Sequence, residues 1–501
     1  MDIQFPSLVS LFLFFSTLIF FKFKSKNSTR NLPPGPWKLP LIGNLHNLMG
    51  ALPHRALHQL ALKHGPLMHL QLGELSAVIV SSPETAKEVM KTHDLNFASR
   101  PPILAAEIMG YGCTNITFGP YGDHWRQLRK ICTLELLSVK RVKSFRALRE
   151  QVCSDLARWI ASMEGTAVNL TEKVYASTYA FTATAALGKM RKEREDLLPL
   201  IKESIGLGAG FDIAELYPSI TLFRMMSRVR RRLSELHEEA DKIFQKIIDD
   251  HKVADSVKNG DESDKQEDLV DVLLKFQDDG LDISLTDNNI KTVILDVLAA
   301  GSETSSTTVD WAMAEMLKNP GIMKRAQDEV RHLFDEKGHV DESLIHELPY
   351  LKSVVKETLR MHPPLPLLLP RKCGDTCQIN GYEIAENTKI IVNAWAINRD
   401  PKYWKDGECF QPQRFIDDEV VDYKGSHFEY IPFGAGRRQC PGISFGIANV
   451  ELPLAMLLYH FDWSLPAGEK TTLDMEEGWG VTAARIQDLC VVPLIITRPL
   501  P

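Results

Sequence analysis

A glycine-rich loop that presents one cysteine at the start of an apolar helical pattern constrains this chain more than any other feature. The loop runs from Phe433 to Gly442, and Cys440 lies just before the apolar stretch 443–461. A helix N-terminus and nearby arginines favour the thiolate form of cysteine, which is the form that binds metal ions. Gly436 and Gly442 would let backbone N–H groups approach the sulfur closely. The loop predicts a thiolate ligand, and the alternative is a connector with a buried structural cysteine.

The residue types in this loop match a known signature. Phe433, Gly436, Arg438, Cys440 and Gly442 occupy every specified position of Phe-x-x-Gly-x-Arg-x-Cys-x-Gly. A chance match in a chain of this composition has odds on the order of 10⁻⁴. The chain resembles the cytochrome P450 family on this motif. The resemblance implies haem b (iron protoporphyrin IX) as cofactor, with Cys440 as the iron ligand, Phe433 beside it, and Arg438 suited to a haem propionate.

The resemblance extends from about residue 32 to the C-terminus, and it implies one large domain. That domain would be mainly α-helical with a smaller β region, although 501 residues could hold two or three domains by length alone. Eight cysteines are too few for a disulfide scaffold, and Cys373 and Cys377 are expected to be ordinary thiols in a β-rich connection. The net charge of -7 gives no indication of a nucleic-acid partner.

The N-terminus is expected to anchor the protein in a membrane. The run from Phe5 to Phe21 is almost entirely apolar and would span roughly 25 Å as a helix, close to the thickness of the endoplasmic reticulum bilayer. A cleavable signal peptide is disfavoured because no positive segment precedes the run and no small-residue cleavage site follows it. The basic residues that follow would keep that flank in the cytosol, and they are Lys22, Lys24, Lys26 and Arg30.

The chain is therefore expected to have three parts. Residues 1–22 would form a signal-anchor transmembrane helix, 23–36 a basic linker with a proline-rich hinge, and 37–501 the domain that resembles the P450 family. This arrangement implies a single-pass protein of the endoplasmic reticulum membrane whose catalytic domain faces the cytosol.

Beyond the anchor, the periodicity is mostly helical. Residues 32–36 should form a stiff extended spacer, and 67–80 should form short strands. Residues 254–268 should be a solvated loop between two helices. Pro453 falls within the helical pattern 443–461, where a kink or irregular turn is expected. A basic cluster opens another helix and should be solvated, with membrane contact as the alternative; its members are Arg228, Arg230, Arg231 and Arg232.

One long helix is predicted over 291–317. Ala300 and Thr304 lie one turn apart on one face, which would leave room for a flat macrocycle and dioxygen. Ser, Thr and Gly are mildly unfavourable within a helix, and such a local conflict often marks a functional site. The stretch resembles the family motif Ala/Gly-Gly-x-Asp/Glu-Thr, in which Thr304 would hydrogen-bond the bound dioxygen and Glu303 would help relay protons. The alternative is a helix whose hydroxyls bond their own carbonyls.

A pair of opposite charges is predicted on a second helix. Glu357 and Arg360 share a face at i, i+3 and can form a charge-assisted pair. The pair resembles the family's Glu-x-x-Arg motif, with Arg414 as the third partner. Gln413 stands where the plant pattern usually has glutamate. The triad is expected to survive in a structural role, without part in catalysis.

Two further segments offer contacts to the cofactor. Trp125 and Arg129 resemble the family's Trp-Arg-x-x-Arg helix and would bind a haem propionate; the alternative is an ordinary packing pair. Arg371 is the analogous candidate from another segment. A basic surface on the cysteine side would suit an acidic electron-donor protein, and its expected members are Lys130, Lys140, Arg141, Lys143 and Arg437.

The resemblance also implies the reaction. A thiolate ligand favours cleavage of the O–O bond, so one oxygen atom of O2 would be inserted into an apolar substrate. Electrons would come from NADPH through a separate NADPH–cytochrome P450 reductase, because the chain shows no flavin or nicotinamide fingerprint. An oxygen-independent haem-thiolate isomerase is the alternative of another class.

The substrate is expected to be an apolar plant metabolite. Segments 360–364, 392–397 and 430–433 resemble plant enzymes of the large microsomal family that acts on terpenoids and alkaloids. A terpenoid (mono-, sesqui- or diterpene) is expected first and an indole-type alkaloid second, by family analogy. The expected substrate contacts are rich in apolar residues and lie at 103–118, 207–211, 365–369 and 481–482.

Overall fold

Strands from both halves of the chain form the main β-sheet. The computed structural model describes residues 31–188, 191–208, 212–257, 267–278, 285–417, 421–466 and 473–496. In it β1 (Leu67–Leu72) and β2 (Leu75–Val80) form an antiparallel hairpin, which confirms the strands predicted in 67–80. β2 pairs in parallel with β7 (Lys389–Val392), and β7 pairs antiparallel with β4 (Arg371–Lys372). The sheet thus places Arg371 on its edge strand, with β7 between it and the N-terminal hairpin.

Two smaller sheets complete the described β region. β9 (Cys490–Ile495) lies between β3 (Val168–Asn169) and β8 (Phe461–Ser464). β5 (Cys377–Ile379) and β6 (Tyr382–Ile384) form a separate hairpin. Cys377 lies in β5 and Cys373 precedes it, and both are free thiols, as predicted.

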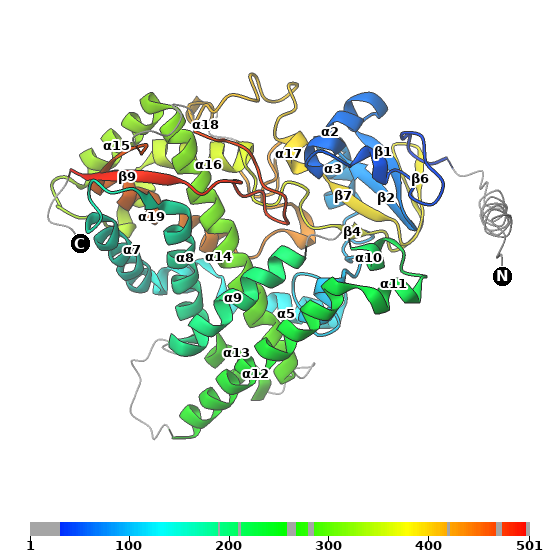
Figure 1. Cartoon of the computed structure of the whole chain (residues 1–501), viewed down its shortest axis with the longest axis horizontal. Helices are drawn as coiled ribbons and strands as arrows, with labels where there is room; N and C mark the ends of the chain where they lie inside the picture. The colour runs from blue at the N-terminus through cyan, green and yellow to red at the C-terminus, as the bar shows by residue number, and fades with distance from the viewer. Residues whose placement is uncertain are drawn as a thin grey trace, which may run out of the picture.

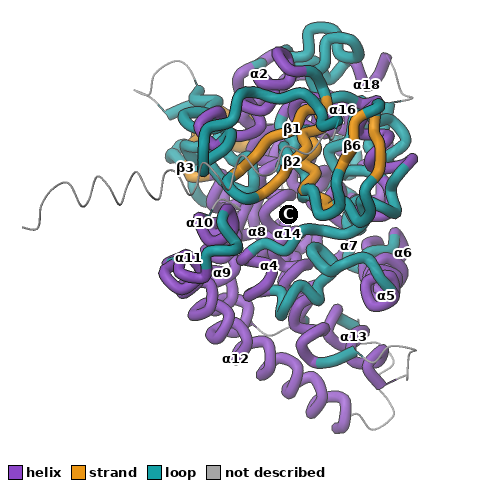
Figure 2. The backbone as a smooth tube through the Cα atoms, turned by 90° about the vertical axis from the view of Figure 1, so that its right-hand side faces the viewer, coloured by secondary structure: helices purple, strands orange, loops and turns teal. Residues whose placement is uncertain are grey.

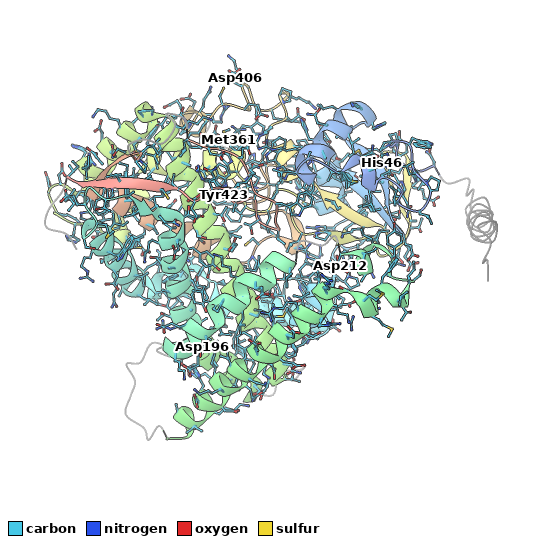
Figure 3. All side chains as sticks on the ribbon, viewed as in Figure 1. His46, Asp196, Asp212, Met361, Asp406 and Tyr423 are labelled. Carbon is cyan, nitrogen blue, oxygen red and sulfur yellow. The ribbon has the colours of Figure 1, made fainter. Side chains whose placement is uncertain are left out.

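A long central helix, α14 (Asp287–Lys318), organises the helical part (Figure 1). It packs against α8 (Leu170–Leu187), α16 (Pro349–Met361) and α19 (Ile443–His460). The helix predicted over 291–317 is confirmed, but it begins earlier because Thr286 and Asn289 form a capping box. α7 (Arg146–Ala161) and α15 (Pro320–Phe334) extend this core. Met361 and Tyr423, labelled in Figure 3, lie in or against it.

A second helical layer lies on the side away from the main sheet. Figure 2 shows the strands at one end of the molecule and α12 (Arg228–Val257) at the other. The other helices of this layer are α4 (Leu104–Met109), α5 (Asp123–Ile131), α9 (Arg191–Leu207) and α13 (Leu269–Asp278). Arg228 begins α12, as predicted for the basic cluster.

Short elements connect these layers. The α-helices are α2 (Pro53–His64), α3 (Pro83–Lys87), α6 (Val139–Ser144), α10 (Ile213–Leu216), α11 (Thr221–Met226), α17 (Ala394–Ile397) and α18 (Arg414–Asp417). The 3-10 and π turns are η1 (Leu45–Asn47), η2 (Glu88–Thr92), η3 (Cys132–Leu136), η4 (Glu342–Glu347) and η5 (Gly436–Arg438).

The loop predicted at 254–268 begins later than expected. α12 continues through Val257, because Ala254 favours the helix and the three residues after it include no glycine or proline to end it. Residues 258–266 lie outside the described residues, and α13 begins at Leu269.

The proline-rich hinge packs on the sheet. Residues 31–38 are extended without helix, as predicted. The N–H of His69 donates to the carbonyl of Pro34 at 2.8 Å, and a Cβ on Gly35 would lie 2.1 Å from the carbonyl oxygen of His69. Only glycine fits this contact, so the segment is docked on β1. The predicted anchor at 1–22 and the linker up to residue 30 lie outside the described residues.

Helix α19 remains helical through Pro453, where a kink or an irregular turn is expected, so the irregular turn is ruled out. It is helical from Ile443 to His460, and Pro453 is buried. Packing against α7 and α14 holds the helix together despite the missing N–H donor. Among the described residues, α19 is also the one helix long and apolar enough to cross a membrane, but most of it is buried in the protein core.

Candidate active site

The cysteine loop is held in place by glycine conformations and by one acidic residue. Gly434 and Gly436 have positive φ angles of 67° and 70°, which favour glycine. A Cβ on Gly436 would lie 2.1 Å from the carbonyl oxygen of Met90. Asp94 accepts a hydrogen bond from the N–H of Arg437 at 2.9 Å. These contacts fix the loop against η2 and place Cys440 just before α19.

The Cys440 thiol lies among groups that stabilise negative charge. Burial raises its pKa, whereas a hydrogen bond from the Gly442 N–H and the charge of Arg129 oppose that rise. The N–H of Cys440 donates to the carbonyl of Phe433 at 3.0 Å, which closes the loop. A thiol that coordinates a metal ion loses its proton outright. The sulfur is therefore placed to act as a ligand.

Helix α5 brings Trp125 and Arg129 to the cysteine loop. The guanidinium of Arg438 lies 4.0 Å from the ring centre of Trp125, and that of Arg129 lies 5.9 Å from it. Arg129 also donates to the carbonyl of Gln439 at 2.5 Å. The indole N–H of Trp125 donates to the carbonyl of Ile116 at 2.9 Å. The structure thus assembles three of the predicted cofactor contacts in one place.

Arg371 and Arg100 join Arg129 and Arg438 in one arginine cluster. The sequence analysis missed Arg100. Arg371 pairs with Asp94 at 3.0 Å and donates to the carbonyl of Ala435. Burial and the charges of Arg371, Arg438 and Arg129 lower the pKa of Arg100 well below its usual value. The only sequence signal for Arg100 was an arginine before Pro101 and Pro102, with no helical or strand pattern around it.

The positive charge of this cluster exceeds what the protein balances. Within the described part of the chain, the one ion pair of these four arginines joins Arg371 to the buried carboxylate of Asp94, which also pairs with the exposed Arg437. Burial, Arg371 and Arg129 also lower the pKa of Arg438 to about 9. Buried charges are stable when they are paired. A ligand with carboxylates along one edge would complete the pairing, and the propionates of haem b fit this requirement.

The predicted distal residues lie on α14. Ala300 is exposed, although Leu298, Ser302 and Ser305 around it are at most 2% exposed. Thr304 donates to the carbonyl of Ala300 at 2.7 Å, so the hydroxyl bonds its own helix. Its oxygen keeps a lone pair for a second donor. The geometry places Ala300 and Thr304 on one face, and their role towards dioxygen stays a prediction.

Glu303 faces a different neighbourhood from Thr304. Burial raises its pKa, and the charge of Lys202 and the neighbouring Thr482 side chain oppose this rise. Lys202 belongs to α9 and Thr482 to the C-terminal segment. Glu303 is therefore held at the junction of α14 with these two segments.

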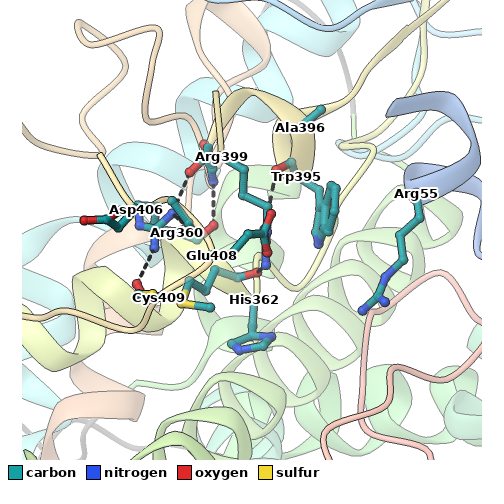
Figure 4. Close-up of polar contacts among 12 residues, drawn as sticks. Arg55, Arg360, His362, Trp395, Ala396, Arg399, Asp406, Glu408 and Cys409 are labelled. Carbon is teal, nitrogen blue, oxygen red and sulfur yellow. Dashed lines mark hydrogen bonds and ion pairs between the residues drawn. The ribbon is translucent and has the colours of Figure 1, made fainter. Parts of the chain in front are cut away.

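The Glu-x-x-Arg triad forms in the core, and Figure 4 shows its Arg360 with the contact to Cys409. Glu357 and Arg360 are fully buried and form two hydrogen bonds, of 2.7 and 2.9 Å. Arg414 donates to Glu357 at 3.1 Å, as predicted. The side-chain amide oxygen of Gln413 accepts from Arg325 Nη1 at 2.7 Å, so a hydrogen bond takes the place of the ion pair that glutamate could form at this position. This triad is structural, because its charged side chains form hydrogen bonds with one another and with backbone carbonyls.

Comparisons with known proteins show the family to which the chain is related. The family model described as Cytochrome P450 matches residues 33–489. The chain is 61% identical to salviol synthase from Salvia pomifera, with all of both chains covered. It is 52% identical to premnaspirodiene oxygenase from Hyoscyamus muticus over 98% of each chain. A zebra fish cytochrome P450 solved with progesterone has a TM-score of 0.74 at 25% identity, covering 89% of this chain and 100% of that one.

The matched length and the identities leave little of the described chain outside the comparison. They also confirm the mainly helical fold with its smaller β region. On these findings the chain belongs to the cytochrome P450 family of haem-thiolate monooxygenases, with haem b as its cofactor.

Proposed function

We propose that this chain is a membrane-anchored monooxygenase that oxidises a plant terpenoid with O2 and electrons from NADPH. The observation that carries the proposal is the Cys440 thiol beside Arg129, which belongs to a cluster of four arginines, a set that fits haem b. Relatives named after terpenes support the substrate class, among them premnaspirodiene oxygenase and, at 49% identity, 5-epiaristolochene 1,3-dihydroxylase from Nicotiana tabacum.

The residues of this chain have separate tasks in the proposed reaction. Bound haem supplies the activation of dioxygen and the insertion of one oxygen atom. Cys440 would hold the iron, with Phe433 beside it. The arginine cluster and Trp125 would hold the propionates. Thr304 would hold a proton at its hydroxyl near the distal face, and Glu303 would pass protons towards it.

The hydrogen bonds of the Asp296 carboxylate on α14 favour a neutral substrate over a basic alkaloid. Asp296 lies one turn before Ala300, and it accepts hydrogen bonds from Asn115 Nδ2 at 2.8 Å, Ile116 N at 2.9 Å and Thr117 N at 3.0 Å. Burial raises its pKa to about 6, against these bonds. The loop therefore saturates this carboxylate, which leaves it unsuited to pair with a protonated amine.

A panel of terpenes tests the substrate class. Membranes that contain the enzyme and a plant NADPH–cytochrome P450 reductase would be given mono-, sesqui- and diterpenes, including premnaspirodiene and 5-epiaristolochene. We expect NADPH consumption and a mass increase of one oxygen atom for at least one terpene, and none for indole-type alkaloids. Conversion of a substrate without NADPH would instead indicate an isomerase.

Electron delivery is proposed at a basic surface on the cysteine side. Lys130, Lys140, Lys143 and Arg437 are exposed. Arg141 was also expected on this surface but is not part of it. Its side chain is mostly covered, packs on Phe145 and lies 4.0 Å from Glu267. The exposed cations would attract an acidic face of the reductase.

Attachment to the endoplasmic reticulum is proposed to use the anchor and an apolar patch. The hydroxyl of Tyr217 donates to the carbonyl of Leu41 at 3.4 Å, so two segments meet there. His46 and Asp212 mark these segments on one side of the molecule in Figure 3. Exposed apolar side chains gather on them, namely Trp37, Leu41, Met49, Ile213, Leu222, Met225 and Met226.

Deletion of residues 1–22 is expected to weaken membrane retention and leave the carbon monoxide spectrum intact, because the haem domain begins beyond the hinge. Adding Leu222→Ser and Met225→Ser should reduce the residual binding about tenfold more, since apolar contact with lipid is lost. Vesicle sedimentation measures both steps. Loss of haem with full membrane retention would contradict this division between anchor and catalytic domain.

A further inference from the structure

A hairpin near the C-terminus carries a buried carboxylate at its base. This C-terminal hairpin comprises residues 476–486. The N–H of Gly478 donates to the carbonyl of Ala484 at 2.7 Å, and the N–H of Ile486 donates to that of Glu476 at 3.0 Å. Glu477 is 4% exposed, whereas the neighbouring Glu476 is exposed. Glu477 thus points into the protein from the base of the hairpin.

The Glu477 carboxylate binds two residues of α2. Its Oε2 accepts from His54 Nε2 at 2.8 Å. The same oxygen accepts from Arg55 Nε at 3.1 Å and from Nη2 at 2.9 Å. α2 lies beside the main sheet in Figure 1, so this contact joins the hairpin to the N-terminal part of the molecule.

The second carboxylate oxygen faces His362 at the end of α16. His362 Nδ1 lies 3.9 Å from Glu477 Oε1, and its Nε2 lies 2.8 Å from Glu315 Oε1. The imidazole stacks on Trp311 of α14 at 3.9 Å and 4°. Burial alone would raise the pKa of Glu477, but the nearby His362 and the hydrogen bond and charges of His54 and Arg55 lower it. The charged form is therefore the one that this site holds.

The tip of the hairpin meets the distal helix. The side chain of Thr482 lies close enough to Glu303 on α14 to help oppose the burial that raises the pKa of that carboxyl. The next residue, Ala483, donates its N–H to the carbonyl of Pro364 at 2.9 Å and accepts from Trp311 Nε1 at 2.8 Å. The base of this hairpin is thus held by the partners of Glu477. Its tip is held on α14 near Glu303, the residue proposed to relay protons.

We propose that Glu477 is a positioning residue that fixes the C-terminal hairpin so that the Thr482 hydroxyl holds Glu303 in place. Glu477 does not touch the reacting atoms and acts through the hairpin. The catalytic part of this inference rests on the proposed monooxygenase function, whereas the structural part does not.

Hydrogen exchange tests the structural part on the haem-containing full-length protein. In Glu477→Gln, the amides of Gly478 and Ile486 should exchange about tenfold faster, because hydrogen bonds to a charged acceptor are the stronger ones. The matched control is Glu476→Gln, one residue away and exposed, which should leave the exchange unchanged. Unchanged exchange in Glu477→Gln would overturn the proposal.

A second variant keeps the proposal testable if Glu477→Gln folds poorly. If Glu477→Gln yields too little haem protein, Arg55→Gln removes one partner whose side chain is 48% exposed. It should accelerate exchange of the same amides by a smaller factor, about threefold. An unchanged rate in this variant would equally overturn the proposal.

Coupling measurements test the catalytic part. With the terpene that is turned over, Glu477→Gln and Thr482→Val should each lower product per NADPH about threefold, and Glu477→Gln should leave the spectral dissociation constant of that terpene within about twofold of wild type. The double variant should be no worse than Thr482→Val alone, since both changes act on one contact. Additive losses would overturn this route. Failure of any terpene to be oxidised would instead refute the proposed function and leave the exchange result standing.

Discussion

Cys440→Ser is expected to abolish the strongly red-shifted Soret band of the ferrous carbon monoxide complex. An alcohol is a poor replacement for a thiolate ligand, and the Gly442 N–H and Arg129 lie where they stabilise negative charge on sulfur. The measurement is the reduced difference spectrum of purified protein. The matched control is Cys409→Ser, because Cys409 is an exposed free thiol outside the loop and should retain the band. Retention of the band in Cys440→Ser would refute the assignment of the ligand.

Thr304→Val is expected to uncouple NADPH consumption from product formation. Valine keeps the shape of the side chain but removes the hydroxyl, which donates to the Ala300 carbonyl and can accept a second hydrogen bond. Product per NADPH should fall at least about tenfold, in line with the loss of a positioned proton donor. Hydrogen peroxide should rise in its place. The measurement compares product, peroxide and NADPH in the same reaction, with substrate binding near normal.

The control for Thr304 is Ser302→Ala on the same helix. The Ser302 hydroxyl is buried and has no hydrogen-bond partner among the described residues, so its removal should leave coupling almost unchanged. If Thr304→Val gave normal product yield without extra peroxide, Thr304 would have no part in the reaction. Such a result would also strengthen the oxygen-independent alternative.

Local patterns predicted the parts of the fold that depend on neighbouring residues. The Cys440 loop, the hairpin in 67–80 and the long α14 could be predicted because turn glycines, alternation and helical periodicity act over short distances. The error lies at an element boundary. α12 continues through Val257, where Ala254 favours the helix, and α19 stays helical through Pro453, where packing against its neighbours outweighs local preference.

Contacts between distant segments could not be predicted in the same way. Arg100 joins the arginine cluster only because its loop packs between the cysteine loop and the segment around Thr117, to whose carbonyl it donates at 2.8 Å. Glu477 binds His54, which is more than four hundred positions away. No periodicity in one sequence links such residues. The family resemblance found Arg371 and Arg438, because they lie within its motifs, and it did not extend to Arg100.

Isotope labelling tests the central claim most directly. The enzyme, a plant NADPH–cytochrome P450 reductase and the terpene that is turned over would react under ¹⁸O₂, with mass-spectrometric detection of the product. The account predicts one ¹⁸O atom in the product for each hydroxyl group formed, with NADPH required and no label from H₂¹⁸O. An unlabelled product, or a product formed without NADPH and O2, would contradict the assignment of this chain as a monooxygenase.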